Sequence, residues 1–298
     1  MKILCLGHAA YDITMPVSGF PTENTKNRVH NKVECGGGPA STAAYLLGKW
    51  KTDVTFAGVV GNDLYGNKIK EELDSVNVNT KYLEMNDELI TTSSFILANS
   101  ENGSRTIFTY WPNTMTLKPF ELDFEPDIIL IDGQEYERSK EILTKYPNAI
   151  SIIDAGRDRK EIIELSKMVN YLVCSKDFAE KVTGIKINYE DSSTLHNLYK
   201  KLEEMFNNTI VVTLESKGCL YKTDILKIMP SIKVKAIDST GAGDIFHGAF
   251  TYGISKGYDL EATLKLANIA GAISVTRIGG RNSIPTMAEM REVYNEFR

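Results

Sequence analysis

The feature that most constrains the fold of this chain is the alternation of short apolar runs with segments of helical spacing. The apolar runs are mostly continuous and rich in β-branched residues, as expected for strands that are covered on both faces. This alternation predicts a mostly parallel central sheet with helices on both faces. The predicted strands are 3–6, 54–60, 128–131, 150–153, 172–174 and 210–214, and the predicted helical segments are 46–49, 69–73, 162–168, 195–206 and 287–297.

Composition excludes several classes of protein. With 298 residues, 42% hydrophobic content and no long apolar run, the chain is expected to form one soluble α/β domain over residues 1–298, with no membrane span and no signal peptide. The net charge of −5 and the scattered Lys and Arg residues argue against binding to nucleic acid. The four cysteines show neither Cys-x-x-Cys spacing nor zinc-type pairing with His, so we expect reduced thiols in a cytoplasmic protein.

Two stretches do not follow the pattern of continuous apolar strands that is typical of a parallel sheet. Residues 28–34 alternate polar with apolar side chains, and residues 94–98 and 105–111 flank Asn102-Gly103, a favoured two-residue hairpin turn. Alternation indicates one solvated face, so these strands are predicted to form a small separate sheet, from about 13–35 and 91–112. A surface hairpin without a functional role is the alternative.

The run Asp-Ser-Thr-Gly-Ala-Gly-Asp-Ile-Phe, residues 238–246, is predicted to bind an anion beside a base. A helix that begins near Ala242 leaves its first N–H groups without partners, and the flanking Gly241 and Gly243 allow a phosphate oxygen to approach the main chain. Asp244 follows in the first turn, where its carboxylate could take a proton from a hydroxyl group. The alternative is an ordinary helix start capped by a neighbouring hydroxyl.

This run resembles the C-terminal signature of the ribokinase-like (PfkB) carbohydrate kinases. Residues 36–44, Gly-Gly-Gly-Pro-Ala-Ser-Thr-Ala-Ala, resemble the N-terminal signature of the same family, and smaller similarities lie at 61–66, 211–218 and 279–281. The resemblance covers essentially the whole chain. It implies a ribokinase-like fold, a lid formed by the small sheet, ATP and Mg²⁺ as cofactors, and a homodimer contact through the lid.

The resemblance also implies residues for the sugar side. Asp12 corresponds to the acid that holds sugar hydroxyls, although it could also be a plain turn residue. The glycines Gly37 and Gly38 would let the main chain approach the substrate, or serve as a lid hinge. Many relatives have Asn where Ser41 stands. Lys26 and Thr109 complete the predicted substrate-binding set.

Residues implied for the nucleotide side follow later strands. Ser175, Thr213, Lys217, Gly218 and Asn268 are the predicted nucleotide contacts, with a packed helix residue as the alternative for Asn268.

Several departures from the family pattern fall near these contacts. Relatives often carry Gly at Glu215, and many have an Asn-x-x-Glu motif where this chain has Ser175 and Phe178, so Mg²⁺ would be held mainly by ATP phosphates and water. Asp238 and Thr240 resemble a monovalent-cation site, which implies K⁺, although they could simply cap the helix. His247 is interpreted as a core histidine.

These observations predict an ATP-dependent kinase that phosphorylates a hydroxymethyl group of a small sugar. Lys26 matches a basic residue that sulfofructose kinases place near an anionic substituent, but Thr109 and Gln134 stand where that enzyme type has Asn and Arg. A neutral ketose or pentose is therefore preferred. A nucleoside kinase, with Tyr110 or Trp111 stacked on a base, is the alternative enzyme. A sugar or nucleotide sensor without transfer is the alternative from another class, and the intact Asp244 opposes it.

Overall fold

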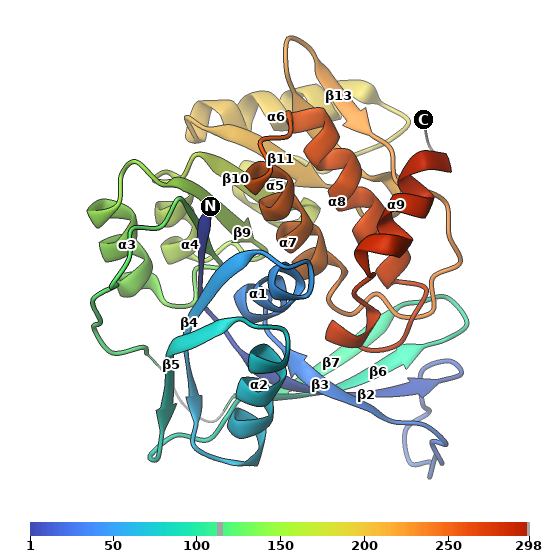
Figure 1. The fold of residues 1–298 in the computed structure, drawn as a ribbon. Helices are drawn as coiled ribbons and strands as arrows, with labels where there is room; N and C mark the ends of the chain where they lie inside the picture. The colour runs from blue at the N-terminus through green and yellow to red at the C-terminus, as the bar shows by residue number, and fades with distance from the viewer. Residues whose placement is uncertain (112–115, 297–298) are drawn as a thin grey trace.

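The computed structural model describes residues 1–111 and 116–296 and contains a large twisted sheet (Figure 1). Its strand order is β13-β12-β11-β10-β9-β8-β1-β4-β5, parallel from β11 to β5, with β12 and β13 added antiparallel at one edge. The strands are β1 (Lys2–Leu6), β4 (Asp53–Gly61), β5 (Asn79–Asn86), β8 (Ile128–Ile131), β9 (Ile150–Ala155), β10 (Tyr171–Ser175), β11 (Thr209–Thr213), β12 (Cys219–Lys222) and β13 (Leu226–Met229).

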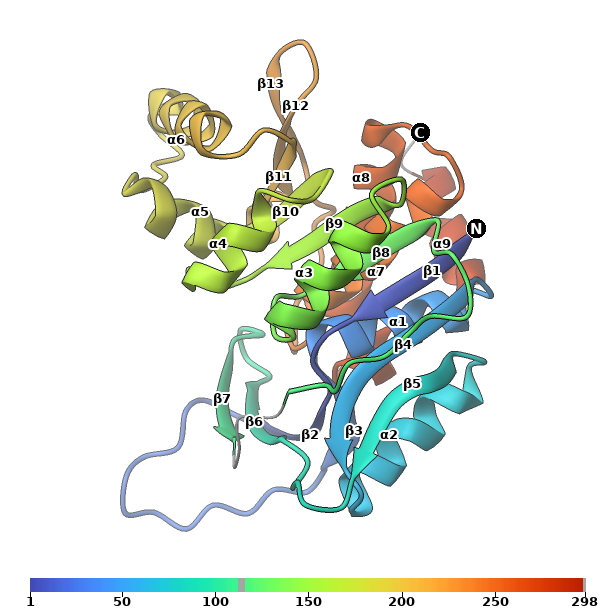
Figure 2. The ribbon, with the colours of Figure 1, turned by 90° about the vertical axis from the view of Figure 1, so that its left-hand side faces the viewer.

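Helices cover both faces of this sheet. One set, α3 to α6, lies in front of it in Figure 2, and the other set packs on the opposite face. The helices are α1 (Pro39–Lys49), α2 (Leu64–Ser75), α3 (Tyr136–Lys145), α4 (Lys160–Ser166), α5 (Lys176–Thr183), α6 (Ser192–Met205), α7 (Ala242–Ser255), α8 (Leu260–Ser274) and α9 (Met287–Glu296). The predicted fold class, a mostly parallel sheet with helices on both faces, is thus confirmed. Position 297 of the predicted last helix lies outside the described residues.

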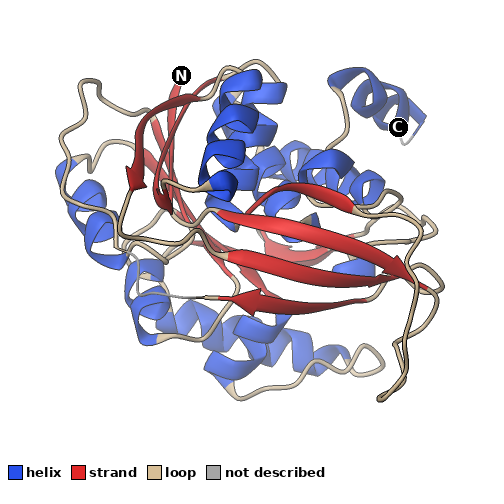
Figure 3. Ribbon diagram, turned by 90° about the horizontal axis from the view of Figure 1, so that it is seen from below, coloured by secondary structure: helices blue, strands red, loops and turns tan. Residues whose placement is uncertain are grey.

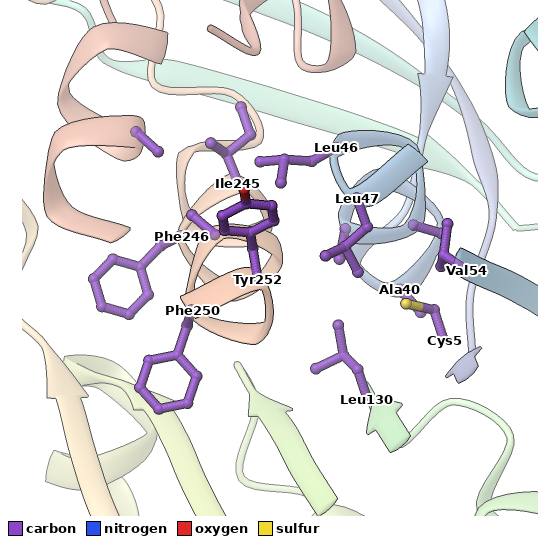
Figure 4. Packing of buried hydrophobic residues seen from close by; sticks show 14 of the residues in the cluster. Cys5, Ala40, Leu46, Leu47, Val54, Leu130, Ile245, Phe246, Phe250 and Tyr252 are labelled. Atoms are coloured by element: carbon purple, nitrogen blue, oxygen red, sulfur yellow. The ribbon is translucent and has the colours of Figure 1, made fainter. Parts of the chain in front are cut away.

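Strand pleating divides the core between the two faces. In β1, Ile3 and Cys5 enter one apolar cluster and Leu4 and Leu6 enter the other, because successive side chains of a strand point to opposite faces. Figure 4 shows the first cluster, where side chains of α1 and α7 meet those of β1, β4 and β8. This packing fixes the N-terminus of α7 relative to the strand ends.

The small sheet has the order β3-β2-β6-β7 and is seen from below in Figure 3. It comprises β2 (Ala10–Val17), β3 (Val33–Gly37), β6 (Ser93–Asn99) and β7 (Arg105–Tyr110), and both predicted stretches contribute to it. Position 112 of the predicted lid lies outside the described residues.

Two details of the predicted small sheet are wrong. Residues 28–32 form no strand, and the hairpin connection spans residues 100–104 rather than two residues. The tip of this connection contacts the segment that precedes α7. Gly103, at φ +73°, accepts a hydrogen bond from the Ser239 N–H (3.1 Å) and approaches Ala236 so closely that a Cβ would lie 2.6 Å from the Ala236 side chain.

Strands β5, β12 and β13 were not predicted, because their polar and apolar residues are mixed. Of these strands, β5 and β13 form the two edges of the large sheet. Across residues 1–111 and 116–296, no helix has the length and apolar character needed to cross a membrane.

Candidate active site

A cavity of about 690 Å³ lies between the carboxyl ends of the central strands and the small sheet, which is the edge where open parallel sheets bind ligands. Its walls combine the residues that follow β1, β8 and β9, the inner face of the small sheet and the start of α7. The lining residues are His8, Ala10, Asp12, Gly38, Pro39, Ser94, Ile96, Arg105, Ile107, Thr109, Trp111, Asp132, Gln134, Asp154, Gly156, Arg157, Arg159, Ile162, Thr240, Gly241, Gly243 and Asp244.

Helix α7 begins at Ala242, as predicted, and presents its N-terminus to the cavity. Gly241 precedes it in the left-handed region, at φ +74°, which glycine adopts without strain. In the described part of the chain, no side chain caps this helix, so the hydroxyl-cap alternative is not what the structure contains. The first-turn amides of Gly243 and Asp244 have no i−4 partner, and both residues line the cavity.

The Asp244 carboxyl group lies among other acids. Burial is the main cause that raises its pKa well above the ordinary value, and the negative charge of Asp154 is the next, while Arg105 lowers it. Burial likewise raises the pKa of Asp154, and His247 opposes that shift. The cavity therefore favours a carboxyl group that binds protons more tightly than an exposed aspartate does.

Asp12 lies within β2, on the opposite wall. Its carboxylate is so close to the β3 main chain that a Cβ on Gly37 would lie 2.1 Å from its Oδ2 atom. Gly37 therefore makes room for the Asp12 side chain and does not itself line the cavity. Burial raises the pKa of Asp12 to about 6, against the lowering effects of a Ser94 hydrogen bond and the Arg281 charge.

Ser41 is fully buried behind this wall and does not line the cavity. Its hydroxyl accepts a hydrogen bond from Arg281, whose guanidinium also pairs with Glu72 at 3.0 Å. Gly36 borders the same guanidinium, because a Cβ there would lie 2.1 Å from its Nη1 atom. The sequence reasoning noted the segment 279–281 but missed the role of Arg281 as a buried cation behind Asp12.

The remaining predicted sugar contacts are divided. Gly38, which precedes α1 at φ +88°, and Thr109 of β7 line the cavity. Lys26 is exposed in the connection between β2 and β3, outside the lining residues.

The predicted nucleotide contacts lie beside the cavity rather than in its lining. Ser175 and Thr213 are paired at the carboxyl ends of β10 and β11. The Ser175 hydroxyl accepts from the Phe178 N–H (3.1 Å) and so caps α5, while the Thr213 hydroxyl donates to the Cys174 carbonyl (3.3 Å). Lys217 lies 5.5 Å from the centre of the Tyr189 ring.

Two other predicted nucleotide contacts pack against β13. A Cβ on Gly218, which has φ +98°, would lie 1.9 Å from the Met229 carbonyl oxygen. The Asn268 amide donates to the same carbonyl at 3.1 Å, so it is a packed helix residue with a satisfied donor. Glu215, by contrast, adopts φ +54°, a conformation that favours glycine.

The predicted cation residues lie beneath the α7 turn. Asp238 is buried and accepts from the N–H groups of Thr240 and Gly279, both at 2.8 Å. The Thr240 hydroxyl is buried without a hydrogen-bond partner among the described residues. An unpartnered oxygen beside a carboxylate fits a monovalent cation. Within the same residues, no group of three or more His, Cys, Asp or Glu side chains could hold a metal ion.

Sequence reasoning missed several lining residues. Asp132 follows β8, Asp154 lies near the end of β9, Arg157 and Arg159 follow β9, and His8 follows β1. The rule that ligands bind at the carboxyl ends of parallel strands could have indicated them. His8 stacks on Trp111 with ring centres 4.7 Å apart.

Comparison with known proteins agrees with this geometry. The family model described as pfkB family carbohydrate kinase matches residues 1–287, and the chain belongs to this family. It is 26% identical to a nucleoside kinase of Methanocaldococcus jannaschii (100% of this chain, 98% of the relative) and 26% identical to a ribokinase of Staphylococcus aureus (98% and 99%).

A solved structure of Arabidopsis thaliana ribokinase, complexed with ribose and ATP, is similar with a TM-score of 0.78, 20% identity and coverage of 98% of each chain. The protein is therefore a phosphotransferase with an alcohol acceptor, a sugar or nucleoside kinase.

Proposed function

We propose that this protein transfers the γ-phosphoryl group of ATP to a hydroxymethyl group of a small sugar, with Asp244 as the general base. The observation that carries the proposal is the position of Asp244 in the first turn of α7, on the wall of a cavity that Asp12 also lines. One carboxylate can hold sugar hydroxyls while the other faces the hydroxyl that reacts.

The reaction moves one proton and one phosphoryl group. Asp244 takes the proton of the acceptor hydroxyl while the oxygen of that hydroxyl forms a bond to the γ-phosphorus. The bond between the γ-phosphorus and the oxygen that bridges it to the β-phosphate breaks, and ADP is released. The amides around Gly241–Gly243 stabilise the charge on the transferring group, without a cationic side chain. Positioning and electrostatics supply most of the rate in such a transfer.

The nucleotide fits the edge formed by the ends of β10 and β11. Ser175 and Thr213 lie there, Lys217 follows β11, and the Arabidopsis relative was solved with ATP. Mg²⁺ would be held by the ATP phosphates and water, because Ser175 is already used as a helix cap. Asp238 and Thr240 would hold K⁺. We expect the rate to rise when KCl replaces choline chloride at equal ionic strength.

The small sheet would act as the lid, and its outer face as a dimer contact. Phe95 and Phe108 are paired across β6 and β7 and are both exposed, by 43% and 54%. Exposed aromatic pairs favour an interface. Sedimentation velocity should give a dimer for the native chain and a monomer for Phe108→Asp. A native monomer would contradict this proposal.

The test of the function is release of ADP across ketoses, pentoses, sugar acids and nucleosides, with Asp244→Asn and Asp224→Asn in parallel. We expect turnover on one acceptor, reduced by about 10²- to 10⁴-fold in Asp244→Asn and unchanged for Asp224→Asn, which alters an exposed bend. If a nucleoside is the best acceptor, the result would favour a nucleoside kinase, in which Trp111 could stack on the base. Absence of acceptor-dependent turnover would favour a sensor.

A further inference from the structure

Three arginines line the cavity, and they fall into two groups. Arg105 of the lid donates to the Ser239 carbonyl (2.9 Å) and hydroxyl (2.7 Å), and it is the cation that lowers the pKa of Asp244. Arg157 and Arg159 lie instead on the exposed segment that follows β9. The mechanism above has no use for this second pair.

Geometry places the second pair on the acceptor side of the cavity. The Nη2 atom of Arg159 donates to the Gln134 Oε1 atom at 2.9 Å, so its guanidinium is held against the segment after β8. In the sheet, β8 lies between β9 and β1, whereas β10 and β11, the proposed nucleotide edge, lie on the other side of β9.

The influence of these arginines on His8 supports the same placement. The pKa of His8 is lowered to about 4, mainly by burial and next by the positive charges of Arg157 and Arg159. His8 follows β1 and stacks on Trp111 of the lid. Both guanidinium groups therefore act on the part of the cavity between β1, β8 and the lid.

Among the residues that the structure describes, no carboxylate neutralises either charge. Asp158, which stands between the two arginines in sequence, is directed to Lys181, 3.4 Å away. Asp132 is occupied by the N–H groups of His8, Ala40 and Gln134. In residues 1–111 and 116–296, no carboxylate forms an ion pair with Arg157 or Arg159. Both side chains line the cavity and retain N–H donors that can bind a ligand.

We propose that Arg157 and Arg159 bind an anionic group of the acceptor, so that the substrate is a small sugar carrying a phosphate, sulfonate or carboxylate. The inference rests on the proposed function, because Asp12 and Asp244 hold the hydroxyl end of the same molecule. A guanidinium presents parallel donors that match an oxyanion in two contacts, which Lys cannot do.

This inference reverses the preference for a neutral sugar that the sequence suggested. The preference depended on Gln134 in place of an arginine, which left Lys26 as the sole cation. The fold brings Arg159 to the Gln134 side chain from the next strand, and it leaves Lys26 outside the cavity. The cation that would bind the anionic group is thus supplied by Arg159 and not by position 134 or Lys26.

Calorimetry without nucleotide tests the binding directly. Two pairs of ligands are compared, fructose with fructose 6-phosphate and sorbitol with gluconate. The members of each pair differ mainly in charge. We expect each anionic member to bind the native chain about ten-fold or more tightly than its neutral partner, as a charge-assisted contact implies. Equal affinities within both pairs would overturn the proposal.

Variants separate the acceptor from the nucleotide. Arg157→Gln and Arg159→Gln should abolish the preference for the anionic sugar while leaving fructose and ATP affinities within two-fold, and Arg159→Lys should retain part of it. Arg291→Gln, an exposed arginine on α9 outside the cavity, is the control and should keep the full preference. Unchanged melting temperatures show that the variants fold.

Two further outcomes have distinct meanings. If the variants lose ATP affinity instead, the arginines belong to the nucleotide and the proposal is wrong. If the anionic sugar binds tightly but no phosphoryl transfer follows, the proposal stands and the proposed function fails.

Discussion

The Nδ1 atom of His247 lies 3.2 Å from the Oδ2 atom of Asp154 and 2.7 Å from the Gly243 carbonyl oxygen. Its Nε2 atom lies 3.0 Å from the Val173 carbonyl oxygen. Carbonyl oxygens only accept, so each ring nitrogen of His247 lies next to an acceptor atom. His247, interpreted from sequence as a core histidine, links α7 to the ends of β9 and β10 and offsets the Asp154 charge beside Asp244.

Asp154→Asn should shift the pH dependence of catalysis. Asp154 is the charge that most raises the pKa of Asp244, after burial. Asp244 must be ionised to act as base, so activity is lost as pH falls through its pKa. Removing the Asp154 charge lowers that pKa, and the acid limb of the kcat/KM profile should move to lower pH. Asp224→Asn provides the control, and an unmoved limb in Asp154→Asn would refute the coupling.

His247→Phe should destabilise the fold. The change removes the ring contacts of His247 with two buried carbonyl oxygens and leaves Asp154 without its partner, which costs about 2–4 kcal/mol in the free energy of unfolding. Urea denaturation measures it. His196→Phe alters an exposed histidine on α6 and should cost less than about 0.5 kcal/mol. Equal midpoints for both variants would show that the pair contributes nothing.

Arg281→Gln should weaken sugar binding most at low pH. The positive charge of Arg281 lowers the pKa of Asp12, which burial raises to about 6. Without that charge the pKa rises further, and Asp12 becomes protonated at higher pH. The acid limb of kcat/KM for the acceptor should therefore move to higher pH, while the KM for ATP stays constant. Arg291→Gln is the matched control. A uniform loss at all pH values would indicate a packing defect instead.

Arg105→Gln should uncouple ATP hydrolysis from transfer. Arg105 joins the lid to the turn before α7 through Ser239, so its loss should leave the cavity open to water. The ratio of ADP released to sugar phosphate formed should rise above one. Arg28→Gln, exposed elsewhere on the lid connection, should keep the ratio at one. A lower rate with an unchanged ratio would contradict a closing role.

Much of the fold could be predicted because it is encoded locally. Continuous β-branched runs and glycine-flanked helix starts depend on neighbouring residues, so the central strands, the start of α7 and the place of Asp244 followed from sequence. Strands β12 and β13 could not be predicted, since each has only four residues and includes a lysine.

Tertiary structure alone decided which charges meet. Arg281 lies 240 residues from Ser41, and the packing of the segment after α8 against α1 brings them into contact. Arg159 lies 25 residues from Gln134, and they meet because the parallel strands β8 and β9 end at the same edge. The sequence alone determined the family motifs, the glycine-flanked turn that starts α7 and the position of the proposed base, Asp244, in its first turn. Packing decided that Ser41 supports Arg281, that His247 pairs with Asp154, and that Arg157 and Arg159 line the cavity, because burial and through-space charge depend on contacts that no local pattern records.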